Sequence, residues 1–228
     1  MIRDTLNVVL INIIHPMFLN TIKDCCYSKF CVGCNRIGSF LCADCINSCQ
    51  LINQPFLPKI QPFHLTQITS LYHYSFPISE LLKKMKYRGV KEISSLIAQL
   101  LHSYLQLPKS ELIISVPISS FKLLNRGFNQ SESIAKELSK LCSIPYQSLL
   151  SKSHASSQVK SHHLAQRLSN LQSKIQLAPT SAHYAHSKIL IVDDVVTSGQ
   201  TLNQCALALK PLNLSACYGV TFASKQCF

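Results

Sequence analysis

The sequence of 228 residues has no tryptophan, only 6 glycines and no long hydrophobic run. Collagen needs a glycine at every third position and a coiled coil needs sustained heptads, so both fibrous classes are excluded. The apolar segment at residues 8–14 is too short to cross a membrane, and no small-residue cleavage site follows it. We therefore expect no membrane insertion, a cytoplasmic location, and a short buried helix or leader at the N-terminus, with a degenerate signal peptide as the alternative.

Acidic residues are also scarce, because 10 Asp and Glu accompany 22 Lys and Arg and leave a net charge of +12. From Leu138 to the C-terminus the only carboxylates are Asp193 and Asp194. An excess of base attracts polyanions, which means nucleic acid or phosphorylated small molecules. Hydrophobic residues make up 47% of the chain, enough to bury a core.

The composition divides the chain into three regions. Residues 1–50 hold the apolar leader and a cysteine cluster, residues 51–66 are rich in proline and are predicted to be a linker, and residues 67–228 alternate apolar runs with helical patterns. We expect strands at 68–74, 112–116, 189–192 and 216–222, helices at 78–87, 91–105 and 199–209, a helix opening at 126–130, and a long loop over 151–187 with a helix near 164–171. Such alternation predicts an α/β fold with a parallel sheet.

Seven of the 11 cysteines lie between Cys25 and Cys49, and four of these form two C-x2-C pairs separated by seven residues. Each pair presents two thiolates from one tight turn, so the two pairs complete a tetrahedral site; its ligands are Cys31, Cys34, Cys42 and Cys45. This spacing predicts a small zinc ribbon with structural zinc, because four thiolates leave no open position for catalysis. An iron–sulfur cluster and unrelated buried thiols are the alternatives, and the roles of Cys25, Cys26 and Cys49 stay open.

The most informative segment runs from Ile189 to Thr201, where a buried strand leads into Asp193 and Asp194 and then into a Thr/Ser/Gly loop that opens a helix. Backbone N–H groups and hydroxyls of such a loop can bind a phosphate at the positive end of the helix. The paired carboxylates can accept hydrogen bonds from ribose hydroxyls and favour positive charge developing at a sugar carbon. The alternative is an ordinary strand–turn–helix junction with an Asp cap.

A second constellation follows the strand at 112–116. Nine residues after Pro117 comes the run Arg126, Gly127, Phe128, Asn129 and Gln130, and Arg126 together with the backbone near Pro117 can hold a pyrophosphate. Arg167 lies in the Ser- and His-rich region, which can close over a substrate as lids do. Lys152 is a further candidate for contact with a phosphorylated sugar.

The Ile189–Thr201 segment resembles the motif of type I phosphoribosyltransferases that binds 5-phosphoribosyl-1-pyrophosphate (PRPP). The resemblance implies that Asp193 and Asp194 contact the ribose hydroxyls and are the catalytic pair. It also implies that the following loop binds the 5′-phosphate; its residues are Val195, Val196, Thr197, Ser198, Gly199, Gln200 and Thr201. The order of apolar leader, cysteine ribbon, Lys-rich segment, RGFNQ run and PRPP motif is similar to that of ComF-family competence proteins.

This resemblance implies an α/β phosphoribosyltransferase-like domain at 67–228, Mg²⁺ bound with PRPP, and a role in the uptake of single-stranded DNA. A competence helicase is a further expected partner. Five basic residues between Lys83 and Lys91 are interpreted as a nucleic-acid contact or as a solvated helix end; the contact residues would be Lys83, Lys84, Lys86, Tyr87 and Arg88. Two other functions stay open at this point, a metabolic phosphoribosyltransferase acting on a nitrogen acceptor without a DNA role, and a zinc-ribbon transcription factor.

Overall fold

The computed structural model describes residues 29–52, 54–57, 61–153 and 174–226. It divides the chain into two compact units, Met1–Ser48 and Cys49–Phe228. In the described part of the first unit, Phe30 forms an antiparallel bridge with Ile37, and the short helix α2 (Ala43–Asn47) follows. Among the described residues, no helix is long and apolar enough to cross a membrane.

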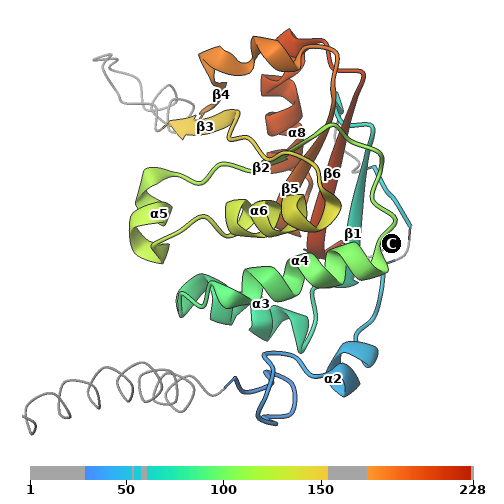
Figure 1. Ribbon diagram of the computed structural model, residues 1–228, viewed down its shortest axis with the longest axis vertical. Helices are drawn as coiled ribbons and strands as arrows, with labels where there is room; N and C mark the ends of the chain where they lie inside the picture. The colour runs from blue at the N-terminus through green and yellow to red at the C-terminus, as the bar shows by residue number, and fades with distance from the viewer. Residues whose placement is uncertain (1–28, 53, 58–60, 154–173, 227–228) are drawn as a thin grey trace, which may run out of the picture. The chain divides into compact units, whose positions relative to one another are not determined.

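The second unit is built on a parallel sheet of four strands in the order β1-β6-β5-β2 (Figure 1). The strands are β1 (Gln67–His73), β2 (Leu112–Ser115), β5 (Lys188–Val196) and β6 (Ala216–Ser224). Parallel strands are buried on both faces, which is why their sequences are nearly continuous apolar runs rather than alternating ones. The sheet confirms the α/β class expected from the sequence.

Helices cover both faces of this sheet (Figure 1). They are α3 (Ile78–Tyr87), α4 (Glu92–Tyr104), α6 (Gln130–Cys142) and α8 (Gln200–Ala208). Ile189 and Ile191 pack in one core cluster with Leu202 and Cys205 of α8. Because side chains alternate along a strand, the buried Leu190 and the other intervening residues of β5 face the opposite side, against which α6 packs.

Strand β5 is longer than the sequence predicts. The apolar pattern places its end at Val192, but in the structure it continues through both aspartates to Val196. The reason is the neighbouring strand: β2 stops opposite Val192, whereas β6 continues to pair with β5 as far as Ser224 opposite Val196. The acidic pair therefore lies on the last part of β5, which is paired with β6 alone.

The RGFNQ run opens helix α6 at Gln130, as the sequence predicts, but it also ends another helix that the sequence does not predict. Residues Ser120–Arg126 form a separate helix, α5, in which the Ser119 hydroxyl accepts a hydrogen bond from the Lys122 N–H. Gly127 ends α5 with φ +74, a left-handed conformation that costs glycine little, and α6 begins at Gln130. The chain thus turns back over the end of β2 before entering α6.

The segment expected as a long loop contains two strands. β3 (Leu150–Ser153) and β4 (Lys174–Leu177) form a separate antiparallel pair, with Leu150 opposite Leu177, and the 3-10 helix η1 (Pro179–Tyr184) follows. The helix predicted near 164–171 lies outside the described residues, as does Arg167.

The segment predicted as a linker belongs to the second unit. Within it, the backbone N–H of Ile52 donates to Leu71 of β1, and Phe56 forms a bridge with Ile68. Its last described part is held by the buried Asn203 of α8, whose side chain accepts from the His64 N–H and donates to the Pro62 carbonyl.

Candidate functional site

A cavity of about 190 Å³ lies at the carboxyl ends of β2 and β5, where open α/β sheets bind their ligands. Four cationic side chains and two carboxylates line it: Lys86, Lys122, Arg126, Lys152, Asp193 and Asp194. The neutral lining comes from the β2–α5 loop, the start of α6 and Thr201 of α8. Because positive charges outnumber negative ones, the cavity favours an anionic ligand.

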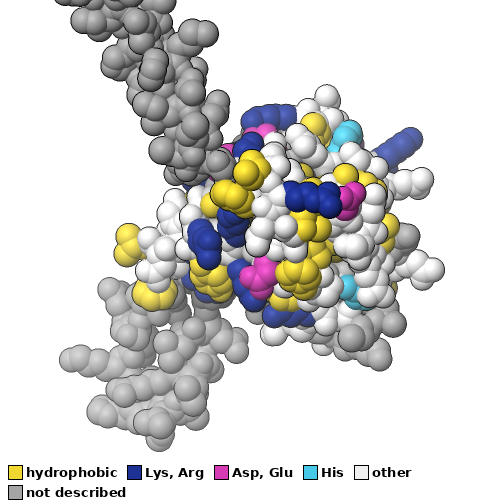
Figure 2. Space-filling model, turned by 90° about the horizontal axis from the view of Figure 1, so that it is seen from below, with side chains coloured by type: hydrophobic (Ala, Val, Ile, Leu, Met, Phe, Trp, Pro, Cys, Tyr) yellow, Lys and Arg dark blue, Asp and Glu magenta, His cyan; other side chains and the backbone are white. Residues whose placement is uncertain are grey.

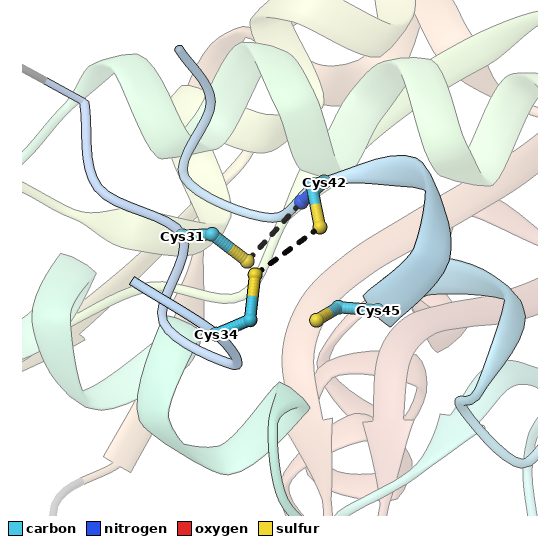
Figure 3. Close-up of side chains that lie close together, drawn as sticks. All are labelled: Cys31, Cys34, Cys42 and Cys45. Atoms are coloured by element: carbon cyan, nitrogen blue, oxygen red, sulfur yellow. Dashed lines mark hydrogen bonds between the residues drawn. The ribbon is translucent and has the colours of Figure 1, made fainter. Parts of the chain in front are cut away.

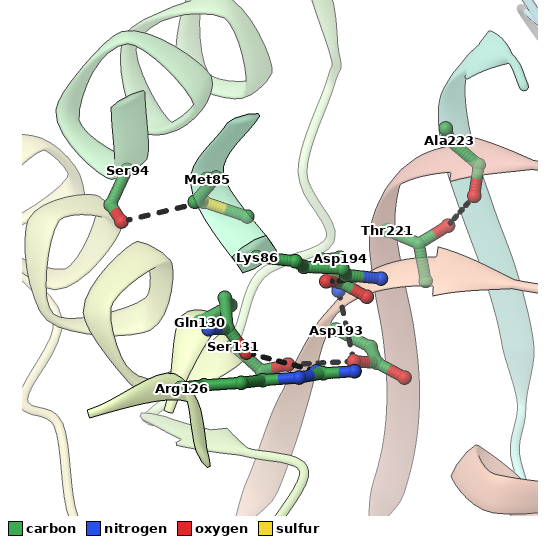
Figure 4. A network of polar contacts seen from close by, with 10 residues as sticks. All are labelled: Met85, Lys86, Ser94, Arg126, Gln130, Ser131, Asp193, Asp194, Thr221 and Ala223. Carbon is green, nitrogen blue, oxygen red and sulfur yellow. Dashed lines mark hydrogen bonds and ion pairs between the residues drawn. The ribbon is translucent and has the colours of Figure 1, made fainter. Parts of the chain in front are cut away.

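The two carboxylates are held in different ways (Figure 4). Asp193 Oδ1 accepts hydrogen bonds from the Ser131 hydroxyl at 2.7 Å and from the Asp194 N–H at 2.9 Å. Burial raises the pKa of Asp193 to about 7, and the charge of Asp194 acts in the same direction. Both effects favour the protonated form of Asp193 compared with an ordinary aspartate.

Asp194 forms an ion pair with a lysine from a helix that is far away in the sequence. Lys86 Nζ of α3 lies 2.8 Å from Asp194 Oδ2, and the two side chains are 19% and 10% exposed (Figure 4). The sequence analysis groups Lys86 with the expected nucleic-acid contacts, but the structure places its ammonium at the acidic pair. No pattern in the sequence indicates this contact, because it depends on how α3 packs in the folded unit.

Arg126 lines the cavity from the end of α5. Its Nη1 donates to Gln130 Oε1 at 3.2 Å, and its guanidinium carbon lies 5.8 Å from the centre of the Tyr87 ring. Gln130 is 2% exposed, and its Nε2 has no hydrogen-bond partner among the described residues. A buried amide donor without a partner is costly unless a ligand or water accepts from it.

The loop after β5 leads into α8 at the rim of the cavity. Thr197 and Ser198 are exposed, Gly199 has φ +77, and α8 begins at Gln200. Of the predicted loop residues, Thr201 lines the cavity, whereas the Val196 side chain is buried in the core and its carbonyl accepts from Lys225 N–H. Any contact from Val196 to a ligand would have to come from elsewhere in its backbone.

The structure brings seven of the fifteen residues predicted for the PRPP site together around one cavity. The predicted residues that line the cavity are Pro117, Arg126, Asn129, Gln130, Asp193, Asp194 and Thr201. Asn129 is fixed there because its amide donates to the Val116 carbonyl at 3.0 Å. Sequence reasoning missed Ser131 and Lys122, although each lies within a few residues of a recognised motif.

The remaining residues of the Lys-rich segment lie on α3 and just after it. Lys83 pairs with Glu80 at 2.7 Å, Tyr87 is 73% exposed, and Arg88 is exposed. On the face shown in Figure 2, Lys and Arg side chains are more numerous than Asp and Glu side chains. The segment therefore contributes one residue to the cavity and several to the surface beside it.

The four predicted metal ligands come together in the first unit (Figure 3). Their sulfur atoms lie within 4.8 Å of one another; the residues are Cys31, Cys34, Cys42 and Cys45. Burial opposes ionisation of Cys31, but backbone N–H groups directed at its sulfur lower its pKa to about 6. Burial and the neighbouring thiols raise the pKa of Cys45 to about 12. Four thiol sulfurs gathered this closely are suited to hold a metal ion.

Comparison with known proteins covers most of the chain. Residues 123–225 match the phosphoribosyl transferase domain. Competence protein F of Haemophilus influenzae is 29% identical over 197 residues, which are 81% of this chain and 85% of that protein. DNA utilization protein YhgH of Shigella flexneri is 30% identical over 78% of this chain and 82% of its own length. Competence protein ComFC of Streptococcus pneumoniae is 22% identical over 73% of this chain and 79% of its own length.

These matches define first a phosphoribosyltransferase-type domain, in which the acidic pair lies near the carboxyl end of β5 and lines the cavity. They also extend well beyond that domain, since they cover more than two thirds of this chain and of each relative. The chain belongs to the ComF family, and the resemblance found in the sequence is confirmed.

Proposed function

We propose that this protein binds PRPP with Mg²⁺ in the cavity above Asp193 and Asp194 and handles incoming single-stranded DNA during competence in the cytoplasm. One observation carries the first part of the proposal: two adjacent carboxylates lie beneath a cavity that four cationic side chains line. A sugar with two hydroxyls flanked by phosphates matches that distribution of charge.

Each part of PRPP has a chemically suited partner. The ribose hydroxyls can donate to the carboxylates, of which Asp194 is already held by Lys86. The pyrophosphate is suited to Arg126 and to the unpartnered amide of Gln130, and the 5′-phosphate to the loop that opens α8. Mg²⁺ bound with PRPP would offset the charge of the pyrophosphate beside two carboxylates.

The DNA role is supported by the names of the relatives and by charge. The relatives are described as competence and DNA utilization proteins, and the net charge of +12 suits a polyanionic partner. These names favour the DNA role over a purely metabolic phosphoribosyltransferase and over a transcription factor. A competence helicase remains a predicted partner.

Phosphoribosyl transfer is a second candidate activity, and the pKa of Asp193 near 7 favours it, because a group of that pKa can exchange a proton at neutral pH. A nitrogen acceptor would form a bond to the sugar carbon that carries the pyrophosphate. The bond between that carbon and the pyrophosphate oxygen would break, and its electron pair would leave on pyrophosphate. The acceptor nitrogen would lose a proton.

We propose that the four cysteines hold structural zinc. Zinc–sulfur bonds of about 2.3 Å in a tetrahedron separate the sulfurs by about 3.8 Å. The sulfur atoms of Cys34 and Cys42 lie 3.6 Å apart, and all four sulfurs lie within 4.8 Å of one another. The proposed ion would neutralise thiolates whose mutual repulsion otherwise opposes the fold of this small unit.

Calorimetric titration with Mg–PRPP tests whether PRPP binds in the cavity lined by Asp193 and Asp194. We expect binding by the wild type and its loss in the Asp193→Ala, Asp194→Ala double variant. Glu137→Ala is a matched control, because it removes a carboxylate of α6 that pairs with Lys140 outside the cavity. Undiminished binding by the double variant would show that the cavity is not the PRPP site. Release of pyrophosphate with candidate nitrogen acceptors then tests catalysis.

A further inference from the structure

Two consecutive residues at the end of α3 contact residues that line the cavity; Lys86 lines it itself, whereas Tyr87 lies beside it. Lys86 forms its ion pair with Asp194 at 2.8 Å, and Tyr87 carries the Arg126 guanidinium over its ring at 5.8 Å. The first contact reaches the acidic pair, and the second reaches the cation that the proposed function assigns to the pyrophosphate. Both contacts depend on the position of the same helical turn.

Tyr87 also presents a surface to solvent. Its side chain is 73% exposed even though Arg126 lies over one part of the ring. The exposed Arg88 follows it directly, and the exposed Lys122 of the adjacent helix α5 also lines the cavity. An exposed aromatic ring among cations is the arrangement that binds single-stranded nucleic acid, with a base stacked on the ring and phosphates beside the cations.

Resting on the proposed function, we propose that single-stranded DNA binds at Tyr87 and that PRPP and DNA exclude one another there through Arg126. One guanidinium cannot neutralise both a pyrophosphate inside the cavity and a DNA phosphate beside Tyr87. The two anions also repel each other across the mouth of the cavity, and each pair of unit charges at about 10 Å in water weakens joint binding roughly twofold before screening by salt.

The coupling must be reciprocal. If Mg–PRPP lowers the affinity for DNA by some factor, DNA lowers the affinity for Mg–PRPP by the same factor. The mechanism assigns the effect to the pyrophosphate, because that is the group suited to Arg126. Mg–pyrophosphate alone should therefore compete with DNA, whereas ribose 5-phosphate should compete weakly.

The test is fluorescence anisotropy of a labelled oligothymidylate with the full-length protein. We expect saturating Mg–PRPP to weaken DNA binding about tenfold, in the range usual for coupled sites. Mg–pyrophosphate should reproduce most of this effect, and ribose 5-phosphate should change the affinity less than about twofold. Equal affinity for DNA with and without Mg–PRPP, or tighter binding with it, would overturn the proposal.

Variants of Tyr87 distinguish DNA binding by base stacking from DNA binding by electrostatic attraction alone. Tyr87→Ala should weaken DNA binding about 5- to 150-fold, the range for loss of one stacked base, and the residual binding should no longer respond to Mg–PRPP. Tyr87→Phe should keep both properties. Tyr104→Ala is the matched control, because it removes a tyrosine that is 49% exposed at the far end of α4. An unchanged affinity in Tyr87→Ala would refute the assignment.

Calorimetry with Mg–PRPP alone distinguishes this inference from the proposed function. If Mg–PRPP binds the protein without DNA but does not affect DNA binding, the proposed function stands and the exclusion is wrong. If Mg–PRPP does not bind at all, the PRPP site itself is wrong and the exclusion through Arg126 is wrong with it.

Discussion

The position of Asp193 should reduce the stability of the fold above neutral pH. Its pKa is about 7 against 3.8 for an ordinary aspartate. A carboxyl group whose pKa is raised by folding stabilises the folded state while it is protonated, and this stability is lost as the pH rises from the unfolded pKa to the folded one. Above neutral pH, the ionised group therefore costs at most about 4 kcal/mol, at about 1.4 kcal/mol for each unit of pKa.

Asp193→Asn removes this cost and keeps the local geometry. The amide oxygen can accept the same hydrogen bonds from the Ser131 hydroxyl and the Asp194 N–H. At each pH we compare the free energy of unfolding of the variant with that of the wild type. The difference in favour of the variant should be larger by about 2 kcal/mol at about pH 8 than at about pH 5.5. The gain should be nearly complete just above pH 7, because the wild-type group is then ionised.

Urea denaturation without PRPP measures the difference at the two pH values. Glu137→Gln serves as the control, because it makes the same kind of substitution on α6 at a carboxylate that pairs with Lys140 outside the cavity. The same gain for Asp193→Asn at both pH values would refute the reasoning. The variant should also bind Mg–PRPP weakly. The substitution that stabilises the fold removes the negative charge that the proposed function uses in binding.

Three further predictions concern other parts of the molecule. Cys34→Ser should lower the zinc content measured by mass spectrometry of the purified protein, whereas Cys205→Ser, at a cysteine buried in the core, should leave zinc unchanged. Asn203→Ala should lower the free energy of unfolding by about 1–3 kcal/mol in urea denaturation, because its hydrogen bonds to the 61–66 segment are lost. Gly219→Ala should destabilise by about 1–3 kcal/mol in the same assay, since the new Cβ meets Ile68 Cγ1 at 3.2 Å and Leu202 Cδ1 at 3.3 Å. A zinc content, or a stability, equal to that of wild type would contradict the corresponding prediction.

The sequence indicates the fold class because buried parallel strands require apolar runs that are visible without any structure. The bounds of α3 are predicted as observed, and those of α4 and α8 lie within a residue of the expectation. The same local logic missed α5 and the pair β3 and β4. These elements are too short to show a clear hydrophobic periodicity. Their conformations depend on neighbouring segments of the fold instead.

The sequence by itself determined the chemical groups: the acidic pair, the RGFNQ run and the two cysteine pairs are each contained in a few consecutive residues. Spacing along the chain is sufficient for these because a tight turn or a strand end brings neighbours together. Only the tertiary structure decided that Lys86 lies on Asp194 and that Tyr87 lies on Arg126. Such contacts join segments far apart in sequence, and the packing of α3 against the rest of the unit fixes them. The sequence shows only the net charge. The structure shows which basic side chains line the cavity and which lie on the surface.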